Sequence, residues 1–186
     1  MSKLWQKNTT DTKSVSAKKV EAFTVGNDHL LDQRLVPYDI RGSIAHAKAL
    51  EKANVISADE RKRLEQALNG IAEIWEKGEF NIRVEDEDMH TAIENHLSEE
   101  LGELGRKIHA GRSRNDQVLT AMRLYEKEAL KGILEKTKSC AEELLSLGER
   151  YTDVPVPGYT HTRRAMLSTI ALWAGGFAEM LILQAE

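Results

Sequence analysis

The sequence contains few of the residues that mark disulfide-rich or aromatic-rich proteins. It has one cysteine, Cys140, three prolines and 5% aromatic residues. A single cysteine excludes an internal disulfide and fits a reducing compartment. Because Cys140 lies within a helical pattern, we expect a small packed side chain there rather than a reactive thiol.

Long apolar runs and an excess of basic residues are also missing. The most apolar stretch, residues 166–178, ends at Glu179 and is shorter than the roughly 20 residues that span a membrane. Residues 1–12 are polar and lack the apolar core of a signal peptide. The net charge of −4 disfavours generic binding to nucleic acids or anionic membranes. We therefore expect a cytoplasmic protein with neither nucleic acid nor membrane as a partner.

Motifs for metals and phosphates are absent as well. The six histidines are scattered along the chain, and none pairs with a cysteine or a second histidine at zinc-like spacing. No glycine-rich phosphate loop is present. The sequence therefore predicts no metal site.

What the sequence does contain is helical periodicity, with no visible β pattern or internal repeat. The composition, 41% hydrophobic and 30% charged, suits a protein with a packed core. Apolar residues recur at helical spacing in five segments, which are 39–50, 58–77, 88–101, 115–150 and the stretch around 170–181. Ser57 and Glu60 form a capping box before the second segment, and Gly78 is its expected C-cap. We predict an all-α fold, preceded by a mobile arm at residues 2–19.

The fourth segment is unusually long. No proline interrupts residues 115–150, which would form a helix about 50 Å long. A helix of this length needs equally long partners, from the same chain or from other chains. The sequence stops at Glu186 inside an apolar helical pattern, so we expect the chain to be a fragment of a longer protein.

Three polar stretches could carry chemistry: residues 86–91, 111–117 and 158–161. The second combines a glycine, two arginines and a Ser/Asn/Asp cluster directly before the long helix. This pattern is typical of an anion-binding loop at a helix N-terminus, or equally of a well-capped helix whose arginines are solvated. A lone histidine such as His90 or His161 is more often a surface or hydrogen-bonded residue than a catalyst, but the three stretches together favour function.

The same stretches resemble the argininosuccinate lyase family of the fumarase/aspartase superfamily. Residues 111–118, GRSRNDQV, match that family's form of the region, and residues 87–91 (EDMHT) and 157–161 (PGYTH) match its two flanking motifs. The order and separations of the motifs also fit, and the resemblance extends from Leu4 onward. It implies an N-terminal helical domain at residues 1–111 and the first part of a truncated long-helix bundle at residues 112–186.

The resemblance implies an activity and a set of site residues. The reaction would cleave argininosuccinate to fumarate and arginine, a step of arginine biosynthesis, without a cofactor and in a homotetramer with shared active sites. His161 would be the catalytic histidine, since imidazole exchanges protons near neutral pH. The expected substrate-binding residues are Ser113, Asn115, Thr160, Arg112, Arg114 and His90. Amides and hydroxyls at a helix start are suited to the extra charge that develops on a carboxylate when a proton leaves the adjacent carbon.

The chain also departs from the family. Thr162 and Arg163 replace the usual Leu-Gln after the Thr-His pair, and Gln6 and Lys7 begin a run that replaces the usual Gly-Gly-Arg-Phe. The family's mobile Gly/Ser-rich loop, which supplies the catalytic serine, does not occur in these 186 residues, so we predict that they do not turn over substrate alone. Two alternatives stay open: a superfamily lyase acting on adenylosuccinate or aspartate, and a non-catalytic helical assembly module of the crystallin kind.

Overall fold

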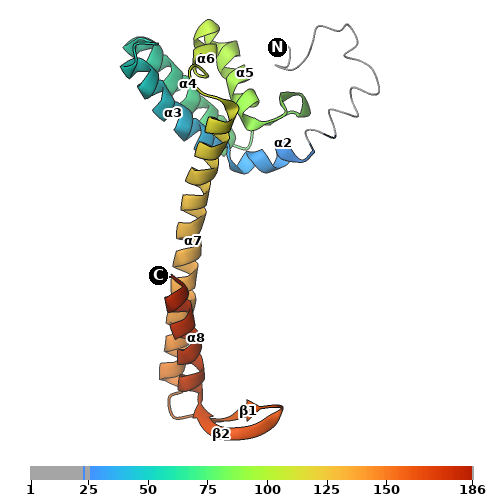
Figure 1. Cartoon of the computed structure of the whole chain (residues 1–186), viewed down its shortest axis with the longest axis vertical. Coiled ribbons are helices and arrows are strands. Elements are labelled where there is room, and N and C mark those ends of the chain that lie inside the picture. Colours follow the sequence, from blue (N-terminus) through green and yellow to red (C-terminus); the bar gives the residue numbers. More distant parts are fainter. Residues whose placement is uncertain (1–22, 24–25, 186) are drawn as a thin grey trace. The chain divides into compact units, whose positions relative to one another are not determined.

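The computed structural model describes residue 23 and residues 26–185. These residues are mainly helical (Figure 1), which confirms the predicted all-α class apart from one hairpin. The chain divides into two compact units, one up to Tyr125 and one from Glu126 onward. The predicted arm at residues 2–19 lies outside the described residues, and the predicted domain boundary after residue 111 stays a prediction.

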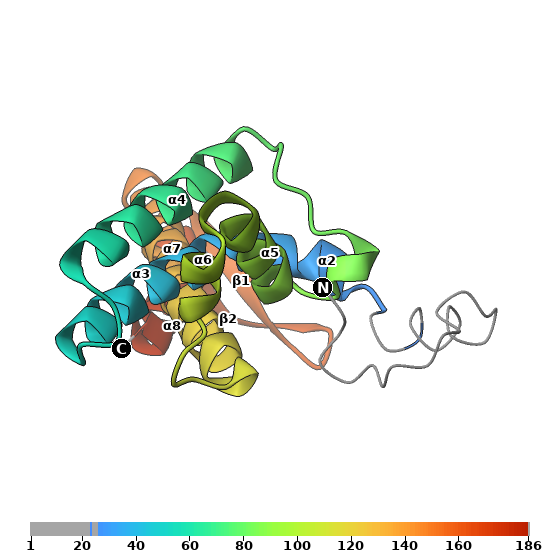
Figure 2. The same cartoon turned by 90° about the horizontal axis from the view of Figure 1, so that it is seen from above.

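The first unit begins with helical segments that follow one another closely. They are α2 (Asp28–Leu31), the 3-10 turn η1 (Asp32–Arg34), α3 (Val36–Lys52) and α4 (Ala58–Glu76). Helices α3 and α4 pack side by side (Figure 2). The helix predicted from Asp39 begins earlier, at Val36, because Pro37 sits in its first turn, where proline needs no backbone donor.

Helix α4 has the ends that the sequence predicts. The backbone N–H of Glu60 donates to Ser57 Oγ at 3.2 Å, and the N–H of Ser57 donates to the Glu60 carboxylate at 2.7 Å. This reciprocal pairing satisfies donors that the first helical turn leaves free. Gly78 follows the helix with φ of +74°, a conformation that glycine adopts without a steric penalty.

Helix α5 (Met89–Leu101) follows the 3-10 turn η2 (Val84–Asp86), and Asp88 caps it. A short helix, α6 (Glu103–Lys107), comes next and was not predicted, because Gly102 and Gly105 read as helix breakers. Gly105 instead permits close packing, since a Cβ built on it would lie 2.3 Å from the carbonyl oxygen of Leu97. The two glycines therefore fold α6 back against α5.

The core of the first unit lies among α3, α4 and α5. Its most deeply buried large side chains are Val36, Leu64, Leu68, Ile71, Met89 and Leu97. All of these except Val36, which precedes the predicted start at Asp39, occupy the apolar stripes predicted from helical spacing. The core fixes the N-terminus of α5, which carries one of the polar stretches.

Helix α7 (Arg114–Arg150) is the predicted long helix and runs from the first unit into the second. Much of its apolar stripe is exposed, including Leu130 and Ile133 at 64% and 59%. Cys140 is also exposed, so the expectation of a packed thiol was wrong. Helical spacing placed Cys140 on an apolar face, but no described element covers that face.

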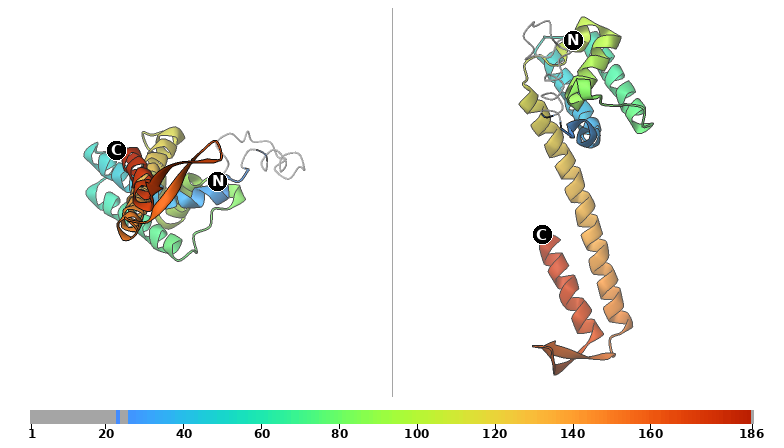
Figure 3. Two further views of the ribbon diagram at one scale, coloured as in Figure 1. Left: turned by 90° about the horizontal axis from the view of Figure 1, so that it is seen from below. Right: turned by 90° about the vertical axis from the view of Figure 1, so that its right-hand side faces the viewer.

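The second unit contains a β-hairpin that the sequence analysis missed. Strands β1 (Pro155–Thr160) and β2 (Arg163–Thr169) pair antiparallel, and α8 (Ile170–Ala185) then runs beside the later part of α7 (Figure 3). Most hairpin residues are exposed on both faces, so the sequence lacks the alternation of apolar and polar residues that would predict strands. The turn residues His161 and Thr162 have φ of 48° and 61°, where glycine or asparagine would be the usual signal.

No helix among the described residues is both long and apolar enough to cross a membrane.

Candidate functional site

The first unit brings two of the three polar stretches together at Arg114. This arginine lies in the first turn of α7, and its Nη2 donates to Thr91 Oγ1 at 3.0 Å. Its Nε lies 3.5 Å from a carboxylate oxygen of Asp88, the residue that caps α5. Asp88 in turn accepts the backbone N–H of Thr91 at 2.7 Å. The N-termini of α5 and α7 are thus joined by one guanidinium group.

Ser113 and Asp116 cap α7. Asp116 Oδ2 accepts the backbone N–H of Ser113 at 2.7 Å and its hydroxyl at 3.0 Å. These bonds, first the backbone N–H and then the hydroxyl, lower the pKa of Asp116 and keep it ionised. Ser113 and Asn115 are exposed at this helix start. The stretch is therefore a well-capped helix start that also leaves polar side chains accessible.

Arg112 points back into the first unit rather than into solvent. Its Nη2 donates to Ser43 Oγ on α3 at 3.0 Å. Burial lowers the pKa of its guanidinium, against the opposing attraction of Asp39. Nearby, His46 Nε2 lies 2.9 Å from the carbonyl oxygen of Ala110, and burial lowers the pKa of this histidine. Helix α3 thus holds both sides of Gly111, which has φ of +74°.

His90 is buried in the first turn of α5. Its Nδ1 lies 2.9 Å from Asp39 Oδ1, and both side chains are almost wholly enclosed. Among the described residues, Asp39 Oδ2, His90 Nε2 and Arg112 Nε have no hydrogen-bond partner although they are buried. Buried polar atoms normally find a partner, so this cluster retains capacity to bind a polar ligand or ordered water.

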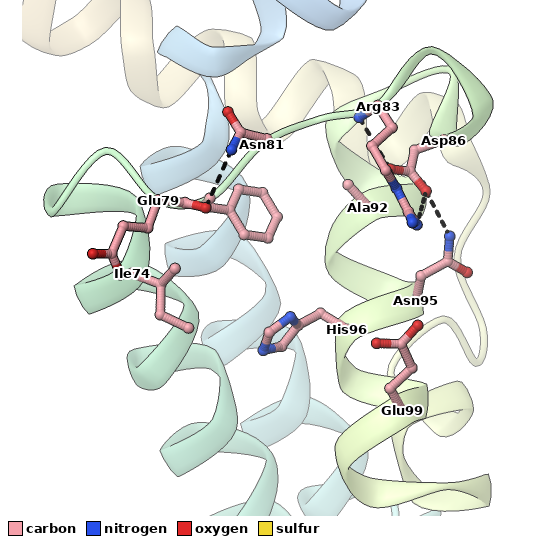
Figure 4. A pocket seen from close by; sticks show the side chains of 10 residues that line it. Ile74, Glu79, Asn81, Arg83, Asp86, Ala92, Asn95, His96 and Glu99 are labelled. Atoms are coloured by element: carbon pink, nitrogen blue, oxygen red, sulfur yellow. Dashed lines mark hydrogen bonds and ion pairs between the residues drawn. The ribbon is translucent and has the colours of Figure 1, made fainter.

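Asp86 organises the segment that precedes α5 (Figure 4). Its carboxylate accepts the backbone N–H of Arg83 at 3.1 Å, the Arg83 guanidinium at 3.0 and 3.2 Å, and Asn95 Nδ2 at 3.0 Å. Burial alone would raise the pKa of Asp86, but the bonds from Arg83 and Asn95 outweigh it and lower the pKa. A cavity of about 260 Å³ beside this network is lined by Arg83, Asp86, Asn95 and His96, among others, and by none of the predicted site residues.

Thr160 and His161 belong to the second unit. They lie at the end of β1 and in the turn of the hairpin, and both side chains are exposed. His161 has a positive φ, an uncommon conformation for a residue other than glycine. The other predicted site residues all belong to the first unit.

Sequence reasoning did not single out the residues of α3 that face these stretches. Asp39 and Ser43 are buried polar residues, and they lie one helical turn apart on the same face of α3. The sequence feature that could have identified them is the presence of polar residues on the otherwise apolar face of this helix. No group of three or more potential metal-ligating side chains occurs within the described part of the chain.

Known proteins match most of this chain in sequence. A family model described as "Lyase" matches residues 14–186. An argininosuccinate lyase of Thermotoga neapolitana is 45% identical over 179 residues, which cover 96% of this chain and 44% of that protein. One of Sorangium cellulosum is 45% identical over 159 residues, covering 86% and 37%. The chain thus spans less than half the length of these curated relatives, and their names confirm the resemblance seen in the motifs.

Solved structures with the same fold are more distant in sequence. An EDDS lyase variant with bound fumarate matches with a TM-score of 0.72 and 20% identity, over 89% of this chain and 33% of that one. A β-carboxy-cis,cis-muconate cycloisomerase of Acinetobacter calcoaceticus matches with a TM-score of 0.63 and 20% identity, over 88% and 39%. At this identity the two structures support the fold alone.

Proposed function

Because the chain belongs to this lyase family, we propose that it forms part of an argininosuccinate lyase. The reaction is elimination of fumarate from argininosuccinate to leave arginine. The observation that carries the proposal is the junction at Arg114, where the 87–91 and 111–118 motifs meet at two helix N-termini. The curated relatives named argininosuccinate lyase support the choice of substrate over adenylosuccinate or aspartate.

In this proposal the start of α7 binds the succinyl carboxylates. Ser113 and Asn115 are exposed there, and a helix N-terminus offers partial positive charge to an anion. Arg112 and Arg114 add positive charge to the same loop, and His90 lies at the neighbouring helix start. A site of this kind is complementary to a carboxylate whose negative charge increases during the reaction.

The chemistry requires a proton transfer and the cleavage of one C–N bond. A base removes a proton from the carbon beside a carboxylate, and the electron pair is held as an aci-carboxylate. Collapse of this intermediate forms the C=C bond of fumarate and expels the nitrogen of arginine, which takes up a proton. We assign proton transfer to His161 and substrate contact to Thr160, with no cofactor in the reaction.

The proposal extends to a cytoplasmic homotetramer with shared active sites. Support comes from apolar side chains that the second unit leaves uncovered, among them Leu130, Ile133, Leu172, Trp173 and Phe177. Long helices with such exposed stripes pack against one another in bundles. Second copies of the same chain would cover these stripes.

The function is tested with the full-length protein that contains these residues. Release of fumarate from argininosuccinate is followed by ultraviolet absorbance. Aspartate and adenylosuccinate are assayed separately as alternative substrates. We expect His161→Ala to lower kcat by at least about 100-fold, because general acid–base groups contribute on this order. Arg164→Ala, an exposed change in the same hairpin, is the matched control and should retain activity. An unchanged rate for His161→Ala would refute the assignment of His161.

A further inference from the structure

The segment before α5 contains a buried carboxylate, Asp86, whose two oxygens both accept hydrogen bonds. Asp86 is 3% exposed and accepts bonds from Arg83, on its own turn, and from Asn95, in the second turn of α5. Figure 4 shows these donors converging on the carboxylate. Neither Arg83 nor Asn95 belongs to the proposed substrate-binding set, and the cavity beside the network is lined by none of that set.

Directly after Asp86 the backbone adopts a sharp and costly turn. Glu87 has φ of 68° and ψ of −52°, and the N–H of Asp88 donates to the carbonyl oxygen of Asp86 at 2.9 Å. This is a γ-turn with positive φ, which is rare and strained for a residue that carries a side chain. Such a conformation persists only where its surroundings hold it.

The turn determines where the next residues point. Asp88 caps α5 and lies next to Arg114, and the N–H of Met89 donates to Asp32 Oδ2 at 3.1 Å. If Glu87 relaxed to a negative φ, Asp88 would leave the cap, and Arg114 would lose one of its two partners at the start of α5, keeping only Thr91. The loop of residues 111–117 would then be joined to α5 through the Thr91 hydrogen bond alone.

We propose that Asp86 is a positioning residue, whose anchored carboxylate holds the strained turn at Glu87 and so fixes the start of α5 against the 111–117 loop. This inference rests on the proposed function, because the loop is the part proposed to bind the substrate carboxylates. Asp86 itself does not contact the substrate. It acts through Asp88 and Arg114.

The test uses four variants of the full-length protein: Asp86→Asn, Glu87→Gly, the two combined, and Glu85→Gln as the control. Glu85 is an exposed carboxylate one residue away, so its variant removes the same charge but none of the hydrogen bonds that Asp86 accepts. We expect Asp86→Asn to raise KM by about tenfold or more, with a smaller change in kcat. Glycine adopts positive φ freely. In the combined variant, Glu87→Gly should therefore bring KM most of the way back to the wild-type value. Glu85→Gln should behave as wild type.

Two outcomes would overturn the inference. One is an Asp86→Asn protein with wild-type KM. The other is a loss confined to kcat that Glu87→Gly does not rescue, as expected if the change only lowers the folded fraction. Should Asp86→Asn fail to fold, Asn95→Ala removes a single donor, and the inference then requires a smaller KM increase that Glu87→Gly also rescues.

Failure of the proposed function would look different. In that case the wild type would release no fumarate from argininosuccinate, and amide hydrogen exchange would replace KM as the readout. Exchange in residues 84–92 should rise in Asp86→Asn and fall back in the combined variant, whatever the substrate is. Unchanged exchange in Asp86→Asn would refute the positioning function independently of any activity.

Discussion

At the scale of single residues, two carboxylates are held ionised in different ways. Asp116 is exposed and is stabilised by the backbone and hydroxyl of Ser113 at the start of α7. Asp86 is buried, and its pKa is low only because several donors outweigh the cost of burial. Loss of charge at Asp86 should therefore matter more for the fold than loss at Asp116.

The stability of the chain should depend on pH through Asp86. Its folded-state pKa lies below the ordinary value of 3.8, so the ionised group stabilises the fold above that pH. This contribution is lost as the pH falls through the folded-state pKa. The difference in unfolding free energy between wild type and Asp86→Asn, measured in urea, should therefore shrink as the pH is lowered from about pH 5 to about pH 2. A difference that stays constant over this range would contradict the assignment.

At the scale of elements, the helices are determined by local patterns, whereas their junctions depend on close contacts. Helix α4 begins at the cap Ser57 that the sequence predicts, and α5 begins directly after Asp88, close to its predicted start. Helix α6 and the β-hairpin have no comparable local signal. Gly105 shows why. A glycine is needed there because α6 approaches the backbone of Leu97 closely, and the neighbouring sequence does not encode that contact.

Two glycine substitutions should have opposite effects on stability. In Gly105→Ala the new Cβ would meet the Leu97 carbonyl, and overpacking of this kind costs about 1–3 kcal/mol. Gly70 lies inside α4 with nothing within 4 Å of an added Cβ. Gly70→Ala should therefore stabilise the chain by about 0.5–1 kcal/mol through helix propensity. Chemical denaturation measures both, and a neutral Gly105→Ala would contradict the described packing of α6.

At the scale of the whole molecule, the two units differ in how much apolar surface they cover. The first unit encloses a continuous core formed by α3, α4 and α5. In the second, buried side chains such as Ala174 and Ala178 are small, and many large ones on α7 and α8 are exposed. The second unit therefore has apolar surface available for association, as the proposed assembly requires.

We expect the 186-residue chain to associate in solution through these stripes. Ile133 and Phe177 are 59% and 48% exposed on α7 and α8, and burying a glutamate at either position would be costly. The double variant Ile133→Glu/Phe177→Glu should lower the mass measured by light scattering after size-exclusion chromatography. Lys131→Glu, on the exposed surface of α7, is the control and should not. A monomeric wild type would contradict the expectation.

The sequence by itself determined the longer helices α3, α4, α5, α7 and α8, the capping box of α4 and the three polar motifs, because periodicity and capping are encoded within a few neighbouring residues. It also determined the family resemblance, since the motifs are contiguous. Only the tertiary structure decided which polar groups meet. Ser43 and Arg112, 69 positions apart, are joined by a hydrogen bond, and Asp39 reaches His90 from a different helix. Such pairings depend on how helices pack, and no local pattern specifies that.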